Sequence, residues 1–212
     1  MRRCLGNSCK AFDFSRGLFT YGYVIIDIYS RYIIHAEVHE RDCAELAQEF
    51  LAKAFRKYGI QPRRLVLHSD NGASMTAKEI LALLENWGVE FSHSRPRVSN
   101  DNPYSESLFR TLKHTGRGYP KKGFRSFLAA RVWLDGFVKT YNHNNYHSGI
   151  NWVTPASRFR GEDAAVLAAR KAVLEAARAK NPRRWINGRV RDCTPAPSQF
   201  LNPDKPTAQA KA

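Results

Sequence analysis

Long apolar runs are missing from this 212-residue sequence. No stretch approaches the roughly 18 apolar residues that a membrane-spanning helix needs, and the first residues, "MRRCLGNSCKAF", lack the apolar centre of a secretory signal. Cysteines are also few: Cys4, Cys9, Cys43 and Cys193 offer no second close Cys/His pair for a zinc site, and we interpret all four as reduced thiols. These absences favour a cytoplasmic protein that has no membrane partner.

Acidic residues are scarce beside basic ones. Nineteen Asp and Glu stand against 34 Lys and Arg, which gives a formal net charge of +15 and a pI near 10.0. Such an excess favours a polyanionic partner, and nucleic acid is the first candidate. Hydrophobic residues make up 43% of the chain, which is enough for one core with appendages.

The hydrophobic pattern predicts an α/β fold. Residues 18–28 and 32–38 are rich in β-branched and aromatic residues and are expected to form a hairpin. The segment "RRLVLHSD" has an almost continuous apolar centre, which is typical of a central strand covered on both faces. The element order therefore predicts a mixed sheet with helices on its faces.

Local signals mark the helix ends. Two predicted capping boxes and two terminal glycines bracket the first two helices: Asp42 with Glu45, Thr76 with Glu79, Gly59 and Gly88. A third helix is expected to start at Asn102, with Pro103 in its first position, and to run through "YSESLFRTLKH".

Two carboxylates stand out in this basic chain. Asp70 follows the predicted central strand, at the edge of an open α/β sheet where ligands bind. Glu106 lies one turn into the third helix, and the 35 residues between the two carboxylates hold one helix, one short strand and a loop. The chain can thus leave the sheet edge and return to it. Converging carboxylates in a basic surround predict a Mg²⁺ (or Mn²⁺) site for phosphoryl transfer.

Two cations follow Glu106 on the same predicted helix. Arg110 is at the i+4 position and Lys113 lies two turns along, so both could hold a DNA phosphate beside the metal. Taken singly, Glu106 and Lys113 also fit a solvated helix face, and Asp70 also fits a turn or cap. Their joint occurrence favours the metal site.

Several longer motifs resemble the integrase-type catalytic core of insertion-sequence transposases and retroviral integrases. They are "YVIIDIYSRYIIHAEV", "LVLHSDNGASM", "SHSRP", "DNPYSESLFRTLK" and "FVKTYNHNNYHSGINWVTPASRF". The resemblance implies a ribonuclease-H-like mixed sheet flanked by helices, with a C-terminal helical extension. It also implies that Asp70 and Glu106 are the second and third of three metal-binding carboxylates, and that Lys113 contacts DNA.

Other residues are expected to play supporting roles. Asp27 is interpreted as structural in its turn, and His68 as a packed, hydrogen-bonded residue. The family's closing motif contains four residues expected to pack the last helix and loop, with possible DNA contact: Tyr141, Asn142, His147 and Trp152. A basic segment around Trp185 could track a phosphate backbone, or could simply be a solvated helix and linker.

The sequence does not show clearly which residue corresponds to the first of the family's three metal-binding carboxylates. Counting back about twenty residues from Asp27 leads to Asn7, in a segment unlike the family's first strand. We therefore expect a truncated or altered N-terminus. As an alternative, "KAFD" could be a short first strand in which Asp13 replaces the missing ligand.

The sequence predicts a DNA transposase catalytic domain that performs metal-dependent phosphodiester hydrolysis and strand transfer. Its partners would be double-stranded DNA, as transposon ends and target, and further copies of itself. The alternatives are a catalytically impaired remnant that binds DNA or inhibits a full-length transposase, and a nuclease of RNA–DNA hybrids. The expected division is an atypical or truncated segment at 1–15, the catalytic core at 16–160, a basic helical extension at 161–193 and a disordered tail at 194–212.

Overall fold

The fold is taken from a computed structural model of the chain. It describes residues 3–13, 19–59, 65–70, 72, 74–95, 101–114, 119–120 and 122–197, and of residues 3–13, 19 and 114 the backbone only. In this part of the chain, no helix combines the length and the apolar character that a membrane crossing requires.

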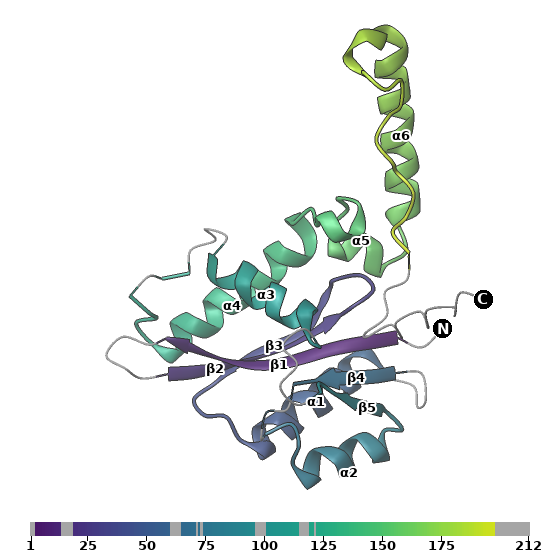
Figure 1. Ribbon diagram of the computed structural model, residues 1–212. Coiled ribbons are helices and arrows are strands. Elements are labelled where there is room, and N and C mark those ends of the chain that lie inside the picture. The colour runs from purple at the N-terminus through teal and green to yellow at the C-terminus, as the bar shows by residue number, and fades with distance from the viewer. Residues whose placement is uncertain are drawn as a thin grey trace, which may run out of the picture.

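Five strands form one mixed sheet in the order β3-β2-β1-β4-β5 (Figure 1). The strands are β1 (Arg3–Asp13), β2 (Phe19–Asp27), β3 (Ile33–His39), β4 (Leu65–Ser69) and β5 (Glu90–His93). The first three strands are antiparallel neighbours, and β1, β4 and β5 run parallel to one another. Mixed pairing confirms the sheet type expected from the order of the elements.

The sequence predicts the central strand, β1, only in part: "KAFD" is the alternative short first strand, which ends at Asp13 as β1 does, and the residues before it are not predicted as a strand. Its residues "RCLGNSCKAFD" include Gly, Asn, Ser and Lys and lack an apolar alternation, so local propensity does not indicate a strand. Pairing with β2 on one side and β4 on the other supplies what propensity lacks. The expected domain boundary at residues 15/16 therefore falls between two hydrogen-bonded strands of one sheet.

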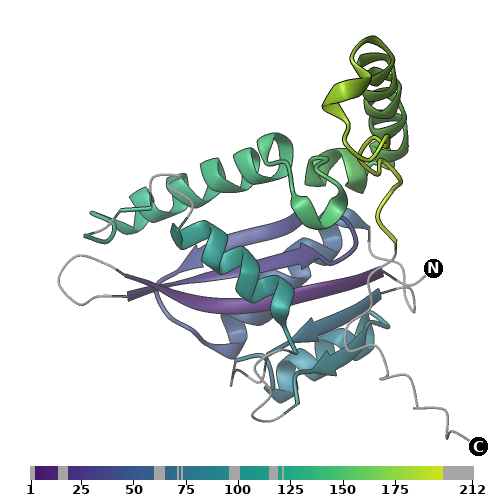
Figure 2. The ribbon, with the colours of Figure 1, turned by 45° about the horizontal axis from the view of Figure 1, so that its top comes forward.

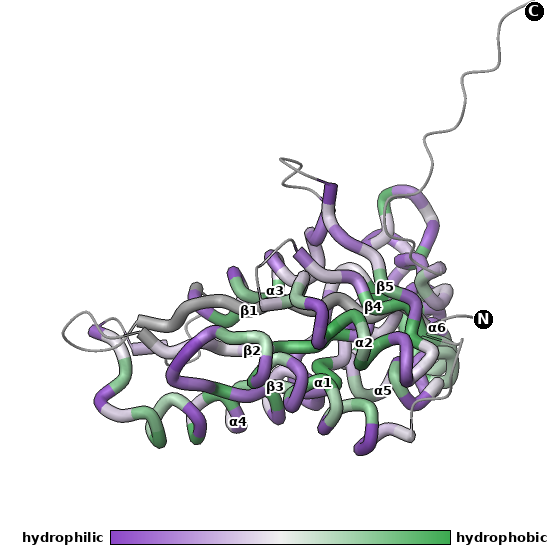
Figure 3. The backbone as a smooth tube through the Cα atoms, turned by 90° about the horizontal axis from the view of Figure 1, so that it is seen from below, coloured by the Kyte–Doolittle hydropathy of each residue, from purple (hydrophilic) through white to green (hydrophobic). Residues whose placement is uncertain are grey.

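Helices cover both faces of the sheet (Figures 1 and 2). They are α1 (Ala44–Tyr58), α2 (Lys78–Asn86), α3 (Pro103–His114) and α4 (Phe127–Asn144). Alternation along β2 sends Tyr23 and Ile25 into a core with α1 and α2, and Val24 and Ile26 into a second core with α3 and α4. Apolar stretches accordingly follow the strands, with hydrophilic connections at the rim (Figure 3).

The predicted helix ends are partly right. Gly59 and Gly88 end α1 and α2 in the left-handed conformation, with φ of 55° and 60°, as expected. The capping boxes are wrong: α1 starts after Cys43 and α2 after Ala77, and neither residue forms a side-chain cap. Asp42, the predicted cap of α1, instead accepts a hydrogen bond from the Tyr23 hydroxyl at 2.5 Å.

A buried amide joins α4 to the edge strand β3. The Asn142 side chain accepts a hydrogen bond from the Ile33 backbone N–H at 2.8 Å and donates one to the Ile33 carbonyl at 3.0 Å. Ile33 lies where the β2–β3 register shifts, between Ile25 and Ile26. Asn142 therefore satisfies backbone groups at an irregular point of the ladder.

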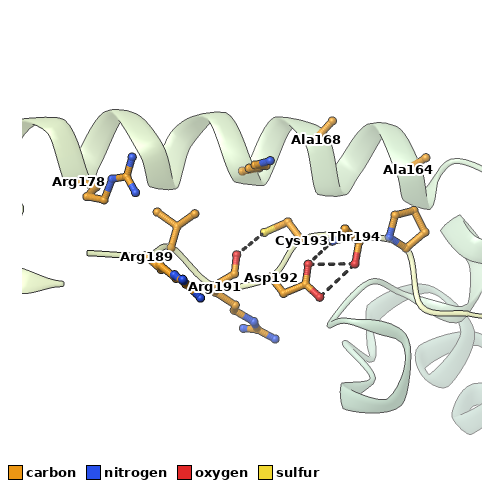
Figure 4. A pocket seen from close by; sticks show the side chains of 11 residues that line it. Ala164, Ala168, Arg178, Arg189, Arg191, Asp192, Cys193 and Thr194 are labelled. Atoms are coloured by element: carbon orange, nitrogen blue, oxygen red, sulfur yellow. Dashed lines mark hydrogen bonds between the residues drawn. The ribbon is translucent and has the colours of Figure 1, made fainter. Parts of the chain in front are cut away.

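Residues 163–197 form an arm that projects from the body (Figure 1). After the short η1 (Ser148–Ile150) and α5 (Pro155–Phe159), helix α6 (Asp163–Lys180) leads away, η2 (Pro182–Arg184) turns the chain, and residues 185–197 return along α6 (Figure 4). The sequence predicts a disordered tail at 194–212. Its first residues are instead placed against the body, because the carbonyls of Ala196 and Pro197 accept hydrogen bonds from Arg158. Residues 198–212 lie outside the described part.

We expect Asn142→Ala to lower the free energy of unfolding by about 1–3 kcal/mol, because both backbone groups of Ile33 would lose a buried partner. Urea denaturation would measure the loss. Asn144→Ala is the matched control, since Asn144 is exposed near the end of the same helix. Equal losses in the two variants would contradict a structural role for the buried amide.

Candidate functional site

Asp70 lies directly beyond the carboxyl end of β4, as the sequence predicts. It is partly buried, and a Cβ atom built on Gly72 would lie 3.6 Å from its Oδ1 atom, so the carboxylate reaches over the following turn. Within β4, Leu67 packs into the core of α1 and α2. Continued alternation places His68 and Asp70 on the other face, the one on which α3 begins.

His68 is a packed residue, as expected. It is fully buried, its Nδ1 lies 3.1 Å from the Ser92 hydroxyl and its Nε2 lies 3.4 Å from the Ser94 hydroxyl. Burial lowers the pKa of His68, so the ring is neutral at pH 7 and joins β4 to β5. It supports the strand end that carries Asp70.

Helix α3 carries the second predicted ligand. It begins at Pro103, where the sequence predicts its start, and the Glu106 N–H donates to the Asn102 carbonyl at 3.2 Å. Glu106 is exposed in the first turn, and Arg110 and Lys113 are exposed further along. The opposite face is buried against α4 and the sheet through Leu108, Phe109 and Leu112. The predicted polar face is therefore present, and it bears one carboxylate followed by two cations.

An ion pair closes the loop that leads into α3. Arg95 donates from its backbone N–H and its Nε to Asp101 Oδ2, at 2.7 and 3.0 Å, and from Nη2 to Oδ1 at 2.9 Å. The Asp101 side chain is 1% exposed, and these hydrogen bonds lower its pKa to about 2. Sequence reasoning missed this pair, although both residues stand in quoted motifs, because a loop composition does not indicate which charges meet.

The β2–β3 turn braces α3 from another side. The buried Asp27 carboxylate accepts hydrogen bonds from the backbone N–H and the hydroxyl of Ser30, which supports the structural role expected for Asp27. Arg31 adopts a φ of 65°, donates to the Ile28 carbonyl at 2.7 Å, and places its guanidinium 3.9 Å from the ring centroid of Tyr104 in α3. The β2–β3 turn thus holds the first helical turn of α3 just before Glu106.

The register of β1 identifies which positions lie beside Asp70. Asn7 pairs with Ser69 in the parallel ladder, so Ser8 is level with Asp70. Residues in register share a face of the sheet, which makes Ser8 the β1 position on the Asp70 side. Asp13 pairs with Phe19 at the far end of β1, five residues or about 17 Å beyond Ser8. The alternative in which Asp13 replaces the missing ligand is therefore wrong.

Few side chains at this site could bind a metal ion. Among the residues with described side chains, no group of three or more His, Cys, Asp or Glu is placed to hold a metal ion. Asp70 and Glu106 remain the two candidates, and Mg²⁺ accepts one or two protein carboxylates when water and phosphate oxygens complete its shell. The residues present fit a weakly held ion.

The closing motif packs as expected. Tyr141 and Asn142 are buried, and the His147 ring accepts a hydrogen bond from the Gly149 N–H at 3.1 Å. Burial lowers the pKa of His147. Trp152 is the exception, because it is 45% exposed and lies at the base of the arm, 5.5 Å from the Arg191 guanidinium.

Protein-family models match most of the chain. Two models described as "Integrase core domain" match residues 8–99 and 87–155. The transposase for insertion sequence element IS904 of Lactococcus lactis is 29% identical over 62% of this chain and 51% of its own length. The putative transposase InsK for IS150 of Escherichia coli is 30% identical over 62% of this chain and 45% of its own. The chain thus spans about half the length of these relatives.

Solved structures share the fold. The catalytic domain of Mos1 mariner transposase superposes with a TM-score of 0.55 at 22% identity, covering 65% of this chain and 70% of that one. The catalytic core domain of BIV integrase gives 0.54 at 19% identity, covering 74% and 95%. These neighbours confirm the ribonuclease-H-like fold expected from the motifs.

The Arg95–Asp101 pair predicts a pH dependence. Because the pKa of Asp101 is lowered from 3.8 to about 2 in the folded chain, its contribution to stability is complete above about pH 4. That contribution falls as the pH drops from about 4 to about 2. We expect Asp101→Asn to unfold at lower urea concentration than the wild type at pH 7, and the difference to shrink as the pH falls through this window. A difference that stays constant down to acid pH would contradict the pairing.

Proposed function

The chain belongs to the integrase core family, which includes insertion-sequence transposases and retroviral integrases, and from this premise we propose that it acts on DNA as a transposase catalytic core. Its reaction would be metal-dependent hydrolysis of a phosphodiester followed by strand transfer. The proposed partners are double-stranded DNA, as transposon ends and target, and further copies of the chain.

The position of Asp70 carries this proposal. The carboxylate follows the last residue of a parallel strand next to the central strand, which is the sheet edge where α/β proteins place their ligands. Helix α3 packs on the face that Asp70 shares, and its first turn exposes Glu106. The Arg95–Asp101 pair and the Arg31–Tyr104 contact hold that turn. Two rigid elements therefore support the two proposed ligands.

Each polar residue has a distinct proposed task. Asp70 and Glu106 would hold Mg²⁺ or Mn²⁺, which supplies, when bound, positive charge for the attacking and leaving oxygens of a phosphodiester. Arg110 and Lys113 would bind DNA phosphates along the exposed face of α3. The net charge of +15 would draw the DNA to this surface.

A second candidate function is favoured by the β1 register. The two positions level with the end of β4 are Asn7 and Ser8, and neither is a carboxylate. A metal held by two carboxylates instead of three binds more weakly and presents less preorganised charge to the phosphodiester. The alternative is thus a transposase-derived domain that binds DNA with little turnover and inhibits an active relative.

The first test replaces the proposed metal ligand. We expect Asp70→Asn to reduce Mn²⁺-dependent nicking of duplex DNA at least about a hundredfold, because charge at the reacting phosphate is the largest catalytic contribution. Asp135→Asn is the matched control, since Asp135 is exposed on α4. Unchanged nicking by Asp70→Asn would remove Asp70 from the site. Preferred cleavage of an RNA–DNA hybrid would replace the transposase assignment with a hybrid nuclease.

The second test restores a carboxylate on β1. We expect Ser8→Asp to tighten Mn²⁺ binding, measured by calorimetry, at least about tenfold and to raise nicking above that of the wild type. Asn7→Asp is the matched control, because strand alternation puts position 7 on the other face. Equal gains in both variants would contradict the register argument. Robust nicking by the wild type would exclude the impaired alternative.

A further inference from the structure

The turn that follows Asp70 contains a buried hydroxyl group. Ser74 is 7% exposed, and no residue in the described part of the chain forms a hydrogen bond with its Oγ atom. A buried hydroxyl without a partner has lost its hydration and gained no protein contact in return, so such groups are uncommon in folded proteins. The fold alone therefore does not explain why a serine occupies this position.

The backbone around Ser74 is fixed by its neighbours. The Gly72 carbonyl accepts hydrogen bonds from the backbone N–H groups of Met75 and Thr76, at 2.9 and 3.2 Å, and from the Thr76 hydroxyl at 3.4 Å. The Met75 side chain is buried in the core that α1 and α2 share. Thr76 thus forms the local bond to the backbone that a hydroxyl in a turn can form, whereas Ser74 does not. The turn itself determines where the Ser74 hydroxyl lies.

The Gly72 backbone relates this hydroxyl to the proposed metal ligand. A Cβ atom built on Gly72 would lie 3.6 Å from Asp70 Oδ1 and 4.0 Å from Ser74 Oγ. Both oxygens therefore face the same point beside Gly72, one from the end of β4 and the other from the turn. A serine hydroxyl can donate to a carboxylate, and a carboxylate that binds a metal ion is commonly held by a second contact of this kind.

We propose that Ser74 is a positioning residue for Asp70, and that its hydroxyl donates a hydrogen bond to the Asp70 carboxylate when that carboxylate binds Mg²⁺ or Mn²⁺. The bond engages one carboxylate oxygen, leaves the other for the ion and so fixes the rotation of the ligand. This support matters more with two carboxylates than with three, because a smaller ligand set holds the ion more weakly. The inference rests on the proposed function, in which Asp70 binds the ion.

The first test compares removal of this hydroxyl with removal of another. We expect Ser74→Ala to weaken Mn²⁺ binding, measured from the EPR signal of the free ion, about tenfold, because contacts to metal ligands commonly contribute that much. Thr20→Val is the matched control and should bind Mn²⁺ like the wild type. The Thr20 hydroxyl is also buried with no partner among the described residues, but Thr20 pairs with Phe12, about 13 Å beyond the β1 position that is level with Asp70.

Thermal unfolding separates a positioning role from a structural one. Removing a buried hydroxyl that has no partner should leave the Tm of the metal-free chain unchanged or higher, because no protein contact is lost. An ion that binds the folded chain raises the Tm, and the rise grows with affinity, so Mn²⁺ should raise the Tm of Ser74→Ala less than that of the wild type. A lower Tm without metal, together with the wild-type rise in Mn²⁺, would assign Ser74 to structure and overturn the proposal.

Two further variants probe the same contact in other ways. Gly72→Ala places a methyl group at van der Waals distance from both oxygens without removing either polar group, and it should weaken Mn²⁺ binding as Ser74→Ala does. Ser74→Thr retains the hydroxyl and should bind Mn²⁺ more tightly than Ser74→Ala. Wild-type affinity in Ser74→Ala would overturn the proposal, whatever Gly72→Ala shows.

Asp70→Asn, titrated in parallel, distinguishes failure of this proposal from failure of the proposed function. Weaker Mn²⁺ binding by both Asp70→Asn and Ser74→Ala would support the two proposals together. Weaker binding by Asp70→Asn alone would keep Asp70 as a ligand and overturn only the role of Ser74. Equal Mn²⁺ binding by Asp70→Asn and the wild type would overturn both.

Discussion

Everything at the site depends on how β1 pairs in the middle of the sheet. It forms an antiparallel ladder with β2, and its parallel ladder with β4 brings together segments that are 62 residues apart in the chain, as in the pair Asn7 and Ser69. That pairing fixes the depth at which β4 ends, and hence the place of Asp70. It also determines which β1 positions can share a ligand with Asp70, since strand positions are spaced by about 3.3 Å and alternate between faces.

The second requirement is that α3 must stay in place above the sheet. Its apolar face packs against the sheet and α4 through Leu108, Phe109 and Leu112. Apolar packing is not directional, so it does not by itself fix the orientation of the first helical turn. Directional contacts do this instead: the bidentate Arg95–Asp101 pair before the helix, and the Arg31 guanidinium over Tyr104 within its first turn. Both arginines lie in segments whose sequence indicates only a loop. Together they nevertheless hold the first turn of α3, which contains Glu106.

The sequence was informative where local physics decides the structure. Gly59 and Gly88 mark helix ends because their left-handed conformations suit glycine, and Pro103 marks a helix start because its missing N–H costs nothing there. The motifs then identified the fold and placed Asp70 at a strand end. Local signals failed where distant partners decide: β1 is a strand through its neighbours, and Asp42 bonds Tyr23 instead of capping α1. The β1 register was also beyond reach, so Asp13 remained an option until the ladder was known.

Arg158 links the β2–β3 turn of the sheet to the C-terminal arm. A fully buried guanidinium is costly unless its donors are satisfied, and here they bind the β2–β3 turn, the start of α6 and the end of the return segment. Its guanidinium lies 4.1 Å from the ring centroid of Tyr29, which is two residues before Arg31 in the β2–β3 turn, residues 27–32. Arg31 in turn contacts Tyr104 of α3. One turn therefore supports both the helix of the candidate site and the base of the basic arm. A shared support of this kind keeps the helix of the candidate site and the base of the arm at a fixed separation.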